Sequence, residues 1–259
     1  MKFQYCSDLH LEFDENRRFL NENPIVASGD VLLLAGDIVP FAVMDKYADF
    51  FDYISDHFEM AWWVPGNHEY YHADISGRSG QLNEKIRDNV SLVNNVSVLH
   101  NGIELIFSTL WTRISPVNDF HIRRGMADFH RIMNHEVLFT PDDCNSLHES
   151  SRSFITEALK NSTILQKVVV THHVPTFMNY PEEYRGSILN EAFAVELSEL
   201  IESDGPDYWI YGHHHSDVEP FYIGKTQMLT NQLGYVAYGE HGRFDHERCI
   251  DYKMLNVNK

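Results

Sequence analysis

The chain has 259 residues, which is long enough for one large α/β domain or two small ones. It is 43% hydrophobic and 22% charged, an ordinary composition for a globular protein with a sizeable core. The formal net charge of -18 repels phosphate backbones, so broad binding to nucleic acids is not expected. The cysteines are far apart and odd in number, which favours reduced thiols in a cytoplasmic protein.

The sequence contains no stretch typical of a signal peptide or of a membrane span. Its N-terminus lacks a long apolar segment, and the longest uninterrupted apolar run covers only residues 31–35. We therefore expect no membrane association. No internal repeat, low-complexity tract or Gly/Ser/Pro linker divides the chain, which predicts a single domain over residues 1–259. Nothing in the pattern indicates an oligomeric state.

Short apolar runs rich in Val, Ile and aromatic residues recur along the chain, and each ends in a polar or glycine-containing turn. Runs of this length are better strands than helices. The strands predicted in this way cover residues 2–6, 31–35, 61–64, 96–99, 104–110, 168–171 and 208–211.

Helical patterns lie between these strands, at residues 43–58, 142–161 and 188–202. Thr140 is the expected N-cap of the second helix, with Pro141 at its first position. Towards the C-terminus, residues 218–223 and 226–230 predict a hairpin, and 252–257 a further edge strand. The order of elements predicts an α/β (α+β) fold, a four-layer αββα sandwich of two mixed β-sheets flanked by helices.

Residues that bind metals well follow five of the predicted strands. In α/β sheets, sites form outside the carboxyl ends of parallel strands, so the five clusters would converge on one crevice. Each cluster alone is more often a capped turn than a ligand, but five in order at the same structural position indicate a site. The clusters are Asp8 and His10; Asp37; Asn67 and His68; His172 and His173; and His213, His214 and His215.

The segment VPGNHEYYH, residues 64–72, allows two interpretations. Its second half fits H-E-x-x-H, a zinc-peptidase motif that works only on a helix, where both histidines share one face. Pro65 and Gly66 end a strand directly before it and Gly77 follows closely, so any helix here is barely two turns. A peptidase would also leave the other four clusters unexplained, and it is the less favoured alternative.

The five clusters together resemble the calcineurin-like metallophosphoesterase family, whose pattern is D-x-H, G-D, G-N-H-[DE], H and G-H-x-H. The opening Ser7-Asp8-Leu9-His10-Leu11-Glu12 is similar to that of small bacterial and phage members. In this chain the motifs span residues 8–215 and read Asp8-Leu9-His10, Gly36-Asp37, Gly66-Asn67-His68-Glu69, His172 and Gly212-His213-His214-His215.

The resemblance implies two divalent cations with Asp37 as the bridging ligand. One cation would be bound by Asp8, His10, Asp37 and His215, and the other by Asp37, Asn67, His172 and His213. Imidazole with carboxylate and amide ligands suits Mn, Fe, Zn, Co or Ni. Two such ions about 4 Å apart can hold a bridging hydroxide that attacks phosphorus. His68 is placed to protonate the leaving oxygen as general acid.

We therefore expect a hydrolase for phosphate mono- or diesters of small molecules. A catalytically silent scaffold with the same fold is the alternative, but such proteins usually lose ligands. Related protein phosphatases carry an aspartate where this chain has Pro40, so His68 needs another partner and protein phosphatase activity is not expected. Residues 119–131 are the predicted substrate lid, with a solvated charged loop as the equal alternative. Candidate phosphate-binding residues are Arg113, Arg123, Arg124, Arg131 and Arg185, and His173 is expected either behind the metal ligands or facing the substrate.

Overall fold

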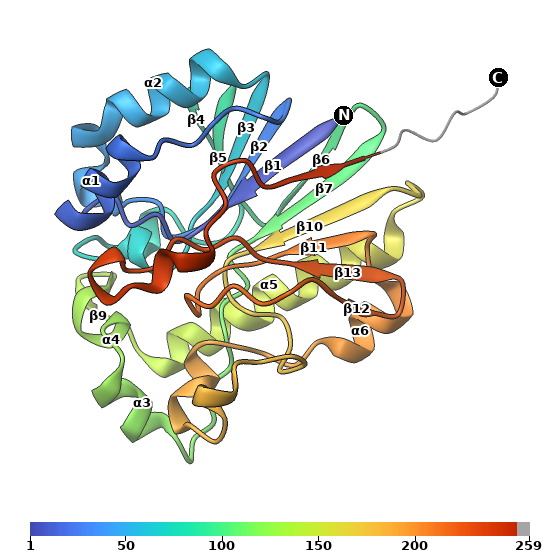
Figure 1. Cartoon of the computed structure of the whole chain (residues 1–259). Helices are drawn as coiled ribbons and strands as arrows, with labels where there is room; N and C mark the ends of the chain where they lie inside the picture. Colours follow the sequence, from blue (N-terminus) through green and yellow to red (C-terminus); the bar gives the residue numbers. More distant parts are fainter. Residues whose placement is uncertain (253–259) are drawn as a thin grey trace.

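The computed structural model describes residues 1–252 and contains two six-stranded mixed β-sheets (Figure 1). The sheets pack face to face, since alternate residues of both form one buried apolar cluster, with Tyr5 and Leu33 from the first sheet and Phe107 and Val170 from the second. Helices cover the outer face of each sheet (Figure 1). The predicted fold of two mixed sheets flanked by helices is confirmed.

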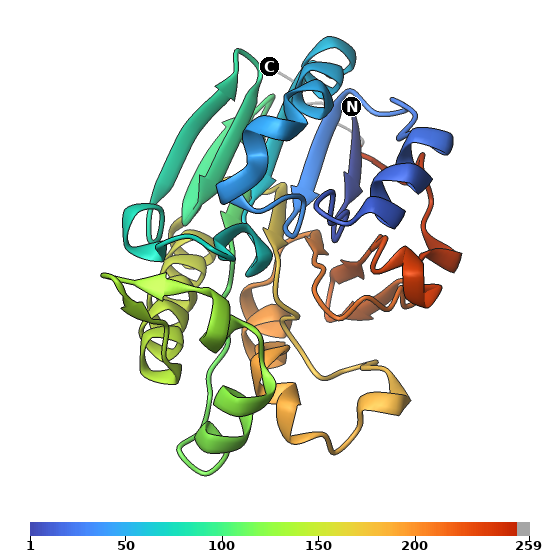
Figure 2. The same cartoon turned by 90° about the vertical axis from the view of Figure 1, so that its left-hand side faces the viewer.

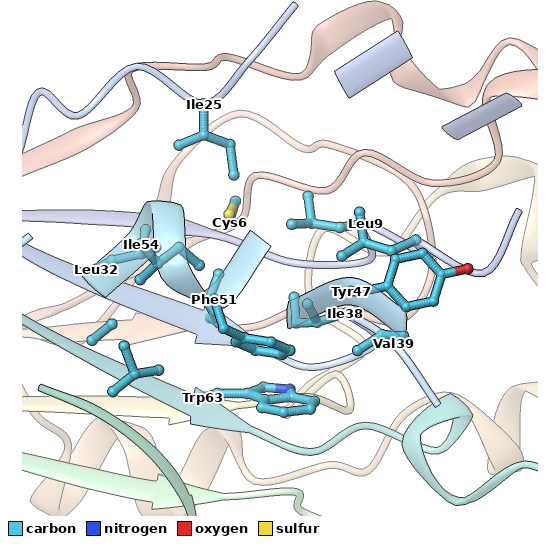
Figure 3. Packing of buried hydrophobic residues seen from close by; sticks show 14 of the residues in the cluster. Cys6, Leu9, Ile25, Leu32, Ile38, Val39, Tyr47, Phe51, Ile54 and Trp63 are labelled. Atoms are coloured by element: carbon cyan, nitrogen blue, oxygen red, sulfur yellow. The ribbon is translucent and has the colours of Figure 1, made fainter. Parts of the chain in front are cut away.

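The first sheet has the order β14-β1-β2-β3-β5-β4. Strands β1, β2, β3 and β5 are parallel, while β14 and β4 pair antiparallel at the edges. Their bounds are β1 Lys2–Cys6, β2 Val31–Ala35, β3 Met60–Val64, β4 Leu82–Arg87, β5 Val90–Asn94 and β14 Cys249–Asp251. Helices α1 (Asp14–Glu22) and α2 (Ala48–His57) cover this sheet, and Phe51 of α2 packs 5.2 Å from the Trp63 ring (Figure 3).

The second sheet has the order β12-β13-β11-β10-β7-β6. Strands β7, β10, β11 and β13 are parallel, and β12 and β6 pair antiparallel at its edges. Their bounds are β6 Val96–His100, β7 Ile103–Ser108, β10 Lys167–Thr171, β11 Tyr208–Ile210, β12 Phe221–Ile223 and β13 Thr226–Leu229. Helices α5 (Pro141–Asn161) and α6 (Ser198–Asp204) cover the outer face, where Ile155 and Ile201 pack in one cluster with Trp209.

The remaining elements lie in the connections between strands. Helices α3 (Asp119–Gly125) and α4 (Asp128–Arg131) and the small hairpin of β8 (Met133–Asn134) and β9 (Val137–Leu138) replace the predicted loop 119–131 and extend it (Figure 2). They share an apolar cluster in which Phe129 stacks on Phe139. The 3-10 turns are η1 Phe41–Tyr47, η2 His68–Tyr70, η3 Ile75–Gly77, η4 Glu182–Tyr184, η5 Ile188–Ala192, η6 Val236–Tyr238 and η7 Glu240–Arg243.

Two predicted helices need correction. The prediction of one helix over 188–202 is wrong, because Val174 hydrogen-bonds the backbone of Phe193 and Val195 and pulls this stretch into a bridge. Only η5 and α6 remain helical on either side. The start of the helix predicted over 43–58 is the 3-10 turn η1.

The C-terminal strand is also shifted. The edge strand ends at Asp251, and the strand predicted over 252–257 lies outside the described residues apart from Tyr252, which is not in a strand. Within residues 1–252, every helix is too short or too polar to cross a membrane.

Candidate metal centre

The carboxyl ends of β1, β2, β3, β10 and β11 meet at one edge of the two packed sheets. Hydrogen bonds connect the loops that follow them. The Asp8 amide donates to the Gly36 carbonyl at 2.9 Å, and the Gly212 amide to the His172 carbonyl at 2.9 Å. The His213 amide donates across the two sheets to the Asp8 carboxylate at 3.1 Å. The strand-end motifs therefore form one site, although they are distant in the sequence.

One group of donor atoms consists of Asp8, His10, Asp37 and His215, with all four ligand atoms within 4.8 Å of one another. The Nε2 atoms of His10 and His215 are 3.0 Å apart. His215 Nε2 lies 3.4 Å from Asp8 Oδ1, and His10 Nε2 lies 3.8 Å from Asp37 Oδ2. This is the set expected for the first cation.

A second group lies on the other side of Asp37. His172 Nε2 is 3.0 Å from His213 Nδ1, 3.1 Å from Asn67 Oδ1 and 3.4 Å from Asp37 Oδ1. The Asn67 amide nitrogen donates to Asp128 at 2.9 Å, so its oxygen faces the imidazoles. The structure thus brings all seven predicted ligands together in two groups, and each group uses a different oxygen of Asp37.

The hydrogen bonds around the first group indicate which ring nitrogens carry protons. His10 Nδ1 faces Glu12 Oε1 at 3.4 Å, and His215 Nδ1 faces Glu240 Oε2 at 2.8 Å. Because a carboxylate can only accept, each Nδ1 carries the proton of a neutral ring, and each Nε2 is left with a lone pair. Two lone pairs 3.0 Å apart repel unless a cation lies between them.

The second group follows the same logic. His172 Nδ1 faces the Ala35 carbonyl at 2.9 Å, and His213 Nε2 faces the Ala192 carbonyl at 3.3 Å. The opposite nitrogens, directed at each other and at the Asn67 oxygen, are therefore acceptors in the neutral rings. With neutral rings, both groups are sets of acceptors without a donor, which fits a divalent cation in each.

The electrostatics of the buried centre favour positive charge. Burial on its own lowers the pKa of His215, but hydrogen bonds and charges from Asp8 and Glu240 outweigh it and raise that pKa to about 10. Asp37 likewise overcomes burial and raises the pKa of His172 to about 9. The carboxylates around His215 and His172 therefore favour a positive charge at the centre, which a bound metal would supply in place of a ring proton.

Five of the seven predicted ligands have left-handed backbone conformations, which L-residues adopt at a cost of about 1–3 kcal/mol each and which cluster at functional sites. These residues are Asp8 (φ 55°), His10 (46°), Asp37 (54°), His213 (80°) and His215 (49°). A Cβ on Gly66 would collide with Asp37 Oδ1 and with the His172 ring, so only glycine allows this close approach. The backbone is strained and shaped around the site.

His68 lies beside the first group, with Glu12 as its partner. Its Nδ1 is 3.1 Å from Glu12 Oε1, and its Nε2 is 3.3 Å from the Tyr235 hydroxyl. The ligand atoms of His10, Glu12 and His68 also lie within 4.8 Å of one another. Burial raises the pKa of Glu12, but hydrogen bonds and charges from both histidines outweigh it and lower that pKa to about 2. Glu12 is therefore a carboxylate.

Glu12 is the residue that the sequence analysis missed. Pro40 leaves His68 without the aspartate of related phosphatases, and Glu12 supplies the carboxylate from a different loop. A signal was present, because Asp8, His10 and Glu12 follow each other at every second position. Only the folded loop after β1, however, shows that the third of them reaches His68.

The H-E-x-x-H segment does not form a peptidase site. It folds into the short turn η2, and His72 is exposed with φ 62° instead of sharing a helix face with His68. Glu69 is fully buried and cannot serve as a general base. It accepts hydrogen bonds from the backbone N–H groups of Asp37, Ile38 and Gly66 and from the Trp63 indole, at 2.7–3.0 Å.

A cavity of about 650 Å³ opens beside the two groups and is lined by Asn67, His68, His213 and His215, among others. Of the five candidate arginines, Arg131 is the one that lines it. Arg123 and Arg124 lie exposed on α3, outside the lining.

Of the two positions expected for His173, behind the ligands or facing the substrate, the structure has the first. The side chain is 1% exposed, its Nδ1 faces the Thr109 carbonyl at 3.1 Å, and its ring packs 4.3 Å from that of His213. Burial and the neighbouring His172 lower the pKa of His173 to about 3. It supports the ligands from behind and does not reach the cavity.

The family model of the calcineurin-like phosphoesterases matches residues 1–217, and the chain belongs to this family. It is a hydrolase that acts on phosphate ester bonds and depends on metal. An uncharacterized protein of Acanthamoeba polyphaga mimivirus, L509, is 34% identical over 285 residues, which cover 98% of each chain. The crystal structure of the phosphopantetheinyl hydrolase from Mycobacterium tuberculosis has a TM-score of 0.63 at 16% identity, over 90% of this chain and 89% of that one, which shows a shared fold.

Proposed function

We propose that this chain hydrolyses phosphate mono- or diesters of small molecules at a binuclear centre of Mn, Fe, Zn, Co or Ni. The observation that carries the proposal is the pair of acceptor groups that share Asp37 on the wall of the cavity. Both sheets contribute ligands to this one centre, which supports residues 1–259 as a single functional domain. The ligand residues are Asp8, His10, Asp37, Asn67, His172, His213 and His215.

Two divalent cations, when bound, supply the Lewis acidity that generates a hydroxide nucleophile and neutralises the phosphate. The protein supplies a proton donor, His68, for the leaving oxygen. Glu12 accepts from Nδ1–H of His68 and would stabilise the imidazolium form of the ring, whose Nε2–H faces the cavity next to the Tyr235 hydroxyl. The positions of these residues suit general acid catalysis of ester cleavage.

Arg131 is the residue placed to bind a phosphate oxygen. Its guanidinium lies 5.5 Å from the centre of the Tyr71 ring, and that ring packs against His68 with the ring centres 4.1 Å apart and the planes tilted by 32°. Among residues 1–252 no ion pair or hydrogen bond occupies this guanidinium, so its fork of N–H donors is available to phosphate.

The size of the cavity supports a small-molecule substrate. A structural neighbour bears the name phosphopantetheinyl hydrolase, which agrees with a phosphorylated small molecule. The alternative, a catalytically silent scaffold, is not favoured, because this chain retains all seven ligand positions as well as His68.

The test is hydrolysis of p-nitrophenyl phosphate and of its bis-ester by metal-stripped and by Mn-reconstituted protein. We expect turnover of at least one ester, only in the reconstituted protein. Absence of turnover of both, with two metals bound per chain, would establish the scaffold alternative.

A further inference from the structure

The cavity beside the metal centre is larger than a phosphate group requires. Its volume of about 650 Å³ lies within the range of about 300–1,000 Å³ that is usual for pockets of drug-sized ligands. It extends from the metal ligands to Tyr184 and Tyr238, which belong to the turns η4 and η6. The organic part of the substrate therefore has a site of its own.

The charge of the cavity wall limits the number of phosphate groups. Arg131 is the single lysine or arginine among the lining residues of the described chain. Glu15 and Glu240 also line the cavity, and their carboxylates repel a phosphate that lies away from the metal centre. A second phosphate group would need a further lysine or arginine in this part of the wall. The wall suits a substrate with one phosphorus atom.

Aromatic rings form a large part of the remaining wall. Tyr238 is 79% exposed and Tyr184 37% exposed, so these two rings are not held in a core. They come from segments 180–193 and 235–240, which lie on the same side of the molecule (Figure 2). Aromatic side chains stack on planar rings such as nucleobases, whichever base is present. The aromatic lining residues are Phe13, Tyr71, Tyr180, Tyr184, Phe193, Tyr235 and Tyr238.

Two buried polar side chains lie in the same wall. His214 Nδ1 accepts hydrogen bonds from Gln232 at 2.9 Å and from the Ser216 amide at 3.3 Å, which leaves Nε2–H as a donor in the neutral ring. Tyr180 is 7% exposed, and its hydroxyl has no partner among residues 1–252. The two rings are 5.8 Å apart. The His214 N–H can donate to the edge of a heterocycle, and the unpaired Tyr180 hydroxyl lies buried in the same wall.

We infer that the substrate is a nucleotide with a single phosphorus atom, whose base is held by the wall of Tyr180, Tyr184, His214 and Tyr238. The inference rests on the proposed function and specifies its substrate class. The phosphate would lie between the metal centre and Arg131, and the base would stack at the outer rings. A monoester and a cyclic diester share this chemistry.

The experiment compares kcat/KM of the Mn-reconstituted protein on 5′-AMP, 2′,3′-cyclic AMP, ADP and glycerol 2-phosphate. The two adenosine compounds with one phosphorus distinguish the monoester from the diester. Base stacking predicts that the better of them exceeds glycerol 2-phosphate by about a hundredfold. Because the wall has no second lysine or arginine for another phosphate, the kcat/KM of the better adenosine compound should exceed that of ADP by about tenfold.

Two variants locate the base. Tyr238→Ala changes an exposed side chain and should raise KM for the adenosine compound about tenfold, with glycerol 2-phosphate unchanged. Tyr180→Phe removes only a hydroxyl and should act in the same selective way. Tyr222→Ala is the matched control, because Tyr222 is 62% exposed on β12 and is not a lining residue.

Equal kcat/KM for the adenosine compounds and glycerol 2-phosphate would overturn the inference and leave the phosphoesterase function intact. The same holds if Tyr238→Ala impairs both substrates equally. If no ester at all is turned over with both metals bound, the proposed function itself fails.

Discussion

The metal centre and the outer cavity wall are neighbours, but they are built differently. The centre lies on the ends of parallel strands, where hydrogen bonds join one loop to the next and five ligand residues are held in left-handed conformations. The outer wall consists of short helices and 3-10 turns with exposed rings such as Tyr238. We infer that the two regions have different roles. The strand ends hold the catalytic groups in place, while the segments that connect the strands determine which substrate binds.

The largest effect is expected at Asp37, where both groups of ligands meet. Asp37→Ala removes one ligand from each cation, so we expect loss of bound metal and a fall in kcat/KM of at least about a thousandfold. Metal content per chain and hydrolysis of p-nitrophenyl phosphate measure the two effects. Asp49→Ala, on the exposed side of α2, is the control and should change neither. A variant at Asp37 with two metals and normal turnover would refute the binuclear centre.

A variant at His68 tests whether this residue is a proton donor or a metal ligand. His68→Ala should keep both metals and lower kcat about 100- to 1,000-fold, because only the proton donor is removed. His72→Ala is the matched control from the same segment, since this exposed histidine takes no part in the site. Loss of one metal from the His68 variant would show instead that His68 is a ligand, with His10 and Glu12 as its companions.

Glu12 tests how the proton donor is positioned, because it contacts His68 and the ligand His10 but does not line the cavity. Glu12→Gln should lower kcat about 10- to 100-fold, as the loss of an orienting partner does in other metal sites, with both metals retained. The loss should be larger for alkyl phosphates than for p-nitrophenyl phosphate, since a poor leaving group depends more on the proton from His68. A merely structural role would affect both esters equally. Glu22→Gln on α1 serves as control.

The sequence was sufficient to predict most strands of the two large sheets and the convergence of the side chains at their ends, whereas the set of seven ligands came from the family resemblance. Strands β4 and β5 were not predicted. Each ligand follows an apolar run of strand length, and the ends of parallel strands meet at one edge, so the position of Asp37 or His213 depends on local pattern and sheet topology alone. The same local pattern was misleading at residues 188–202. There the backbone bridge between Val174 and Ala194 competes with helix formation, and no periodicity in the sequence reveals it.

The partner of His68 and the cavity wall were not predictable in this way. Glu12 is a short distance past β1, but its contact with His68 spans 56 positions and depends on how two loops fold against each other. Tyr180 and Tyr235 belong to connections whose course is decided by tertiary packing. For the arginines, charge alone indicated Arg123 and Arg124 as strongly as Arg131, although only the last of these lines the cavity.

The smallest effect is predicted for the arginines, and it tests directly whether Arg131 binds phosphate while Arg124 does not. Arg131→Ala should lower kcat/KM for a phosphate monoester about tenfold, mostly through KM, because one charged hydrogen-bonding group to phosphate is lost while the metal centre remains. Arg131→Lys should recover only part of this, since lysine keeps the charge but lacks the planar fork and the contact with Tyr71. Arg124→Ala should leave kcat/KM within about twofold of the parent, because a screened surface charge contributes little. If Arg124→Ala impairs hydrolysis as much as Arg131→Ala, then α3 closes over the substrate and the outer wall is more mobile than its short helices indicate.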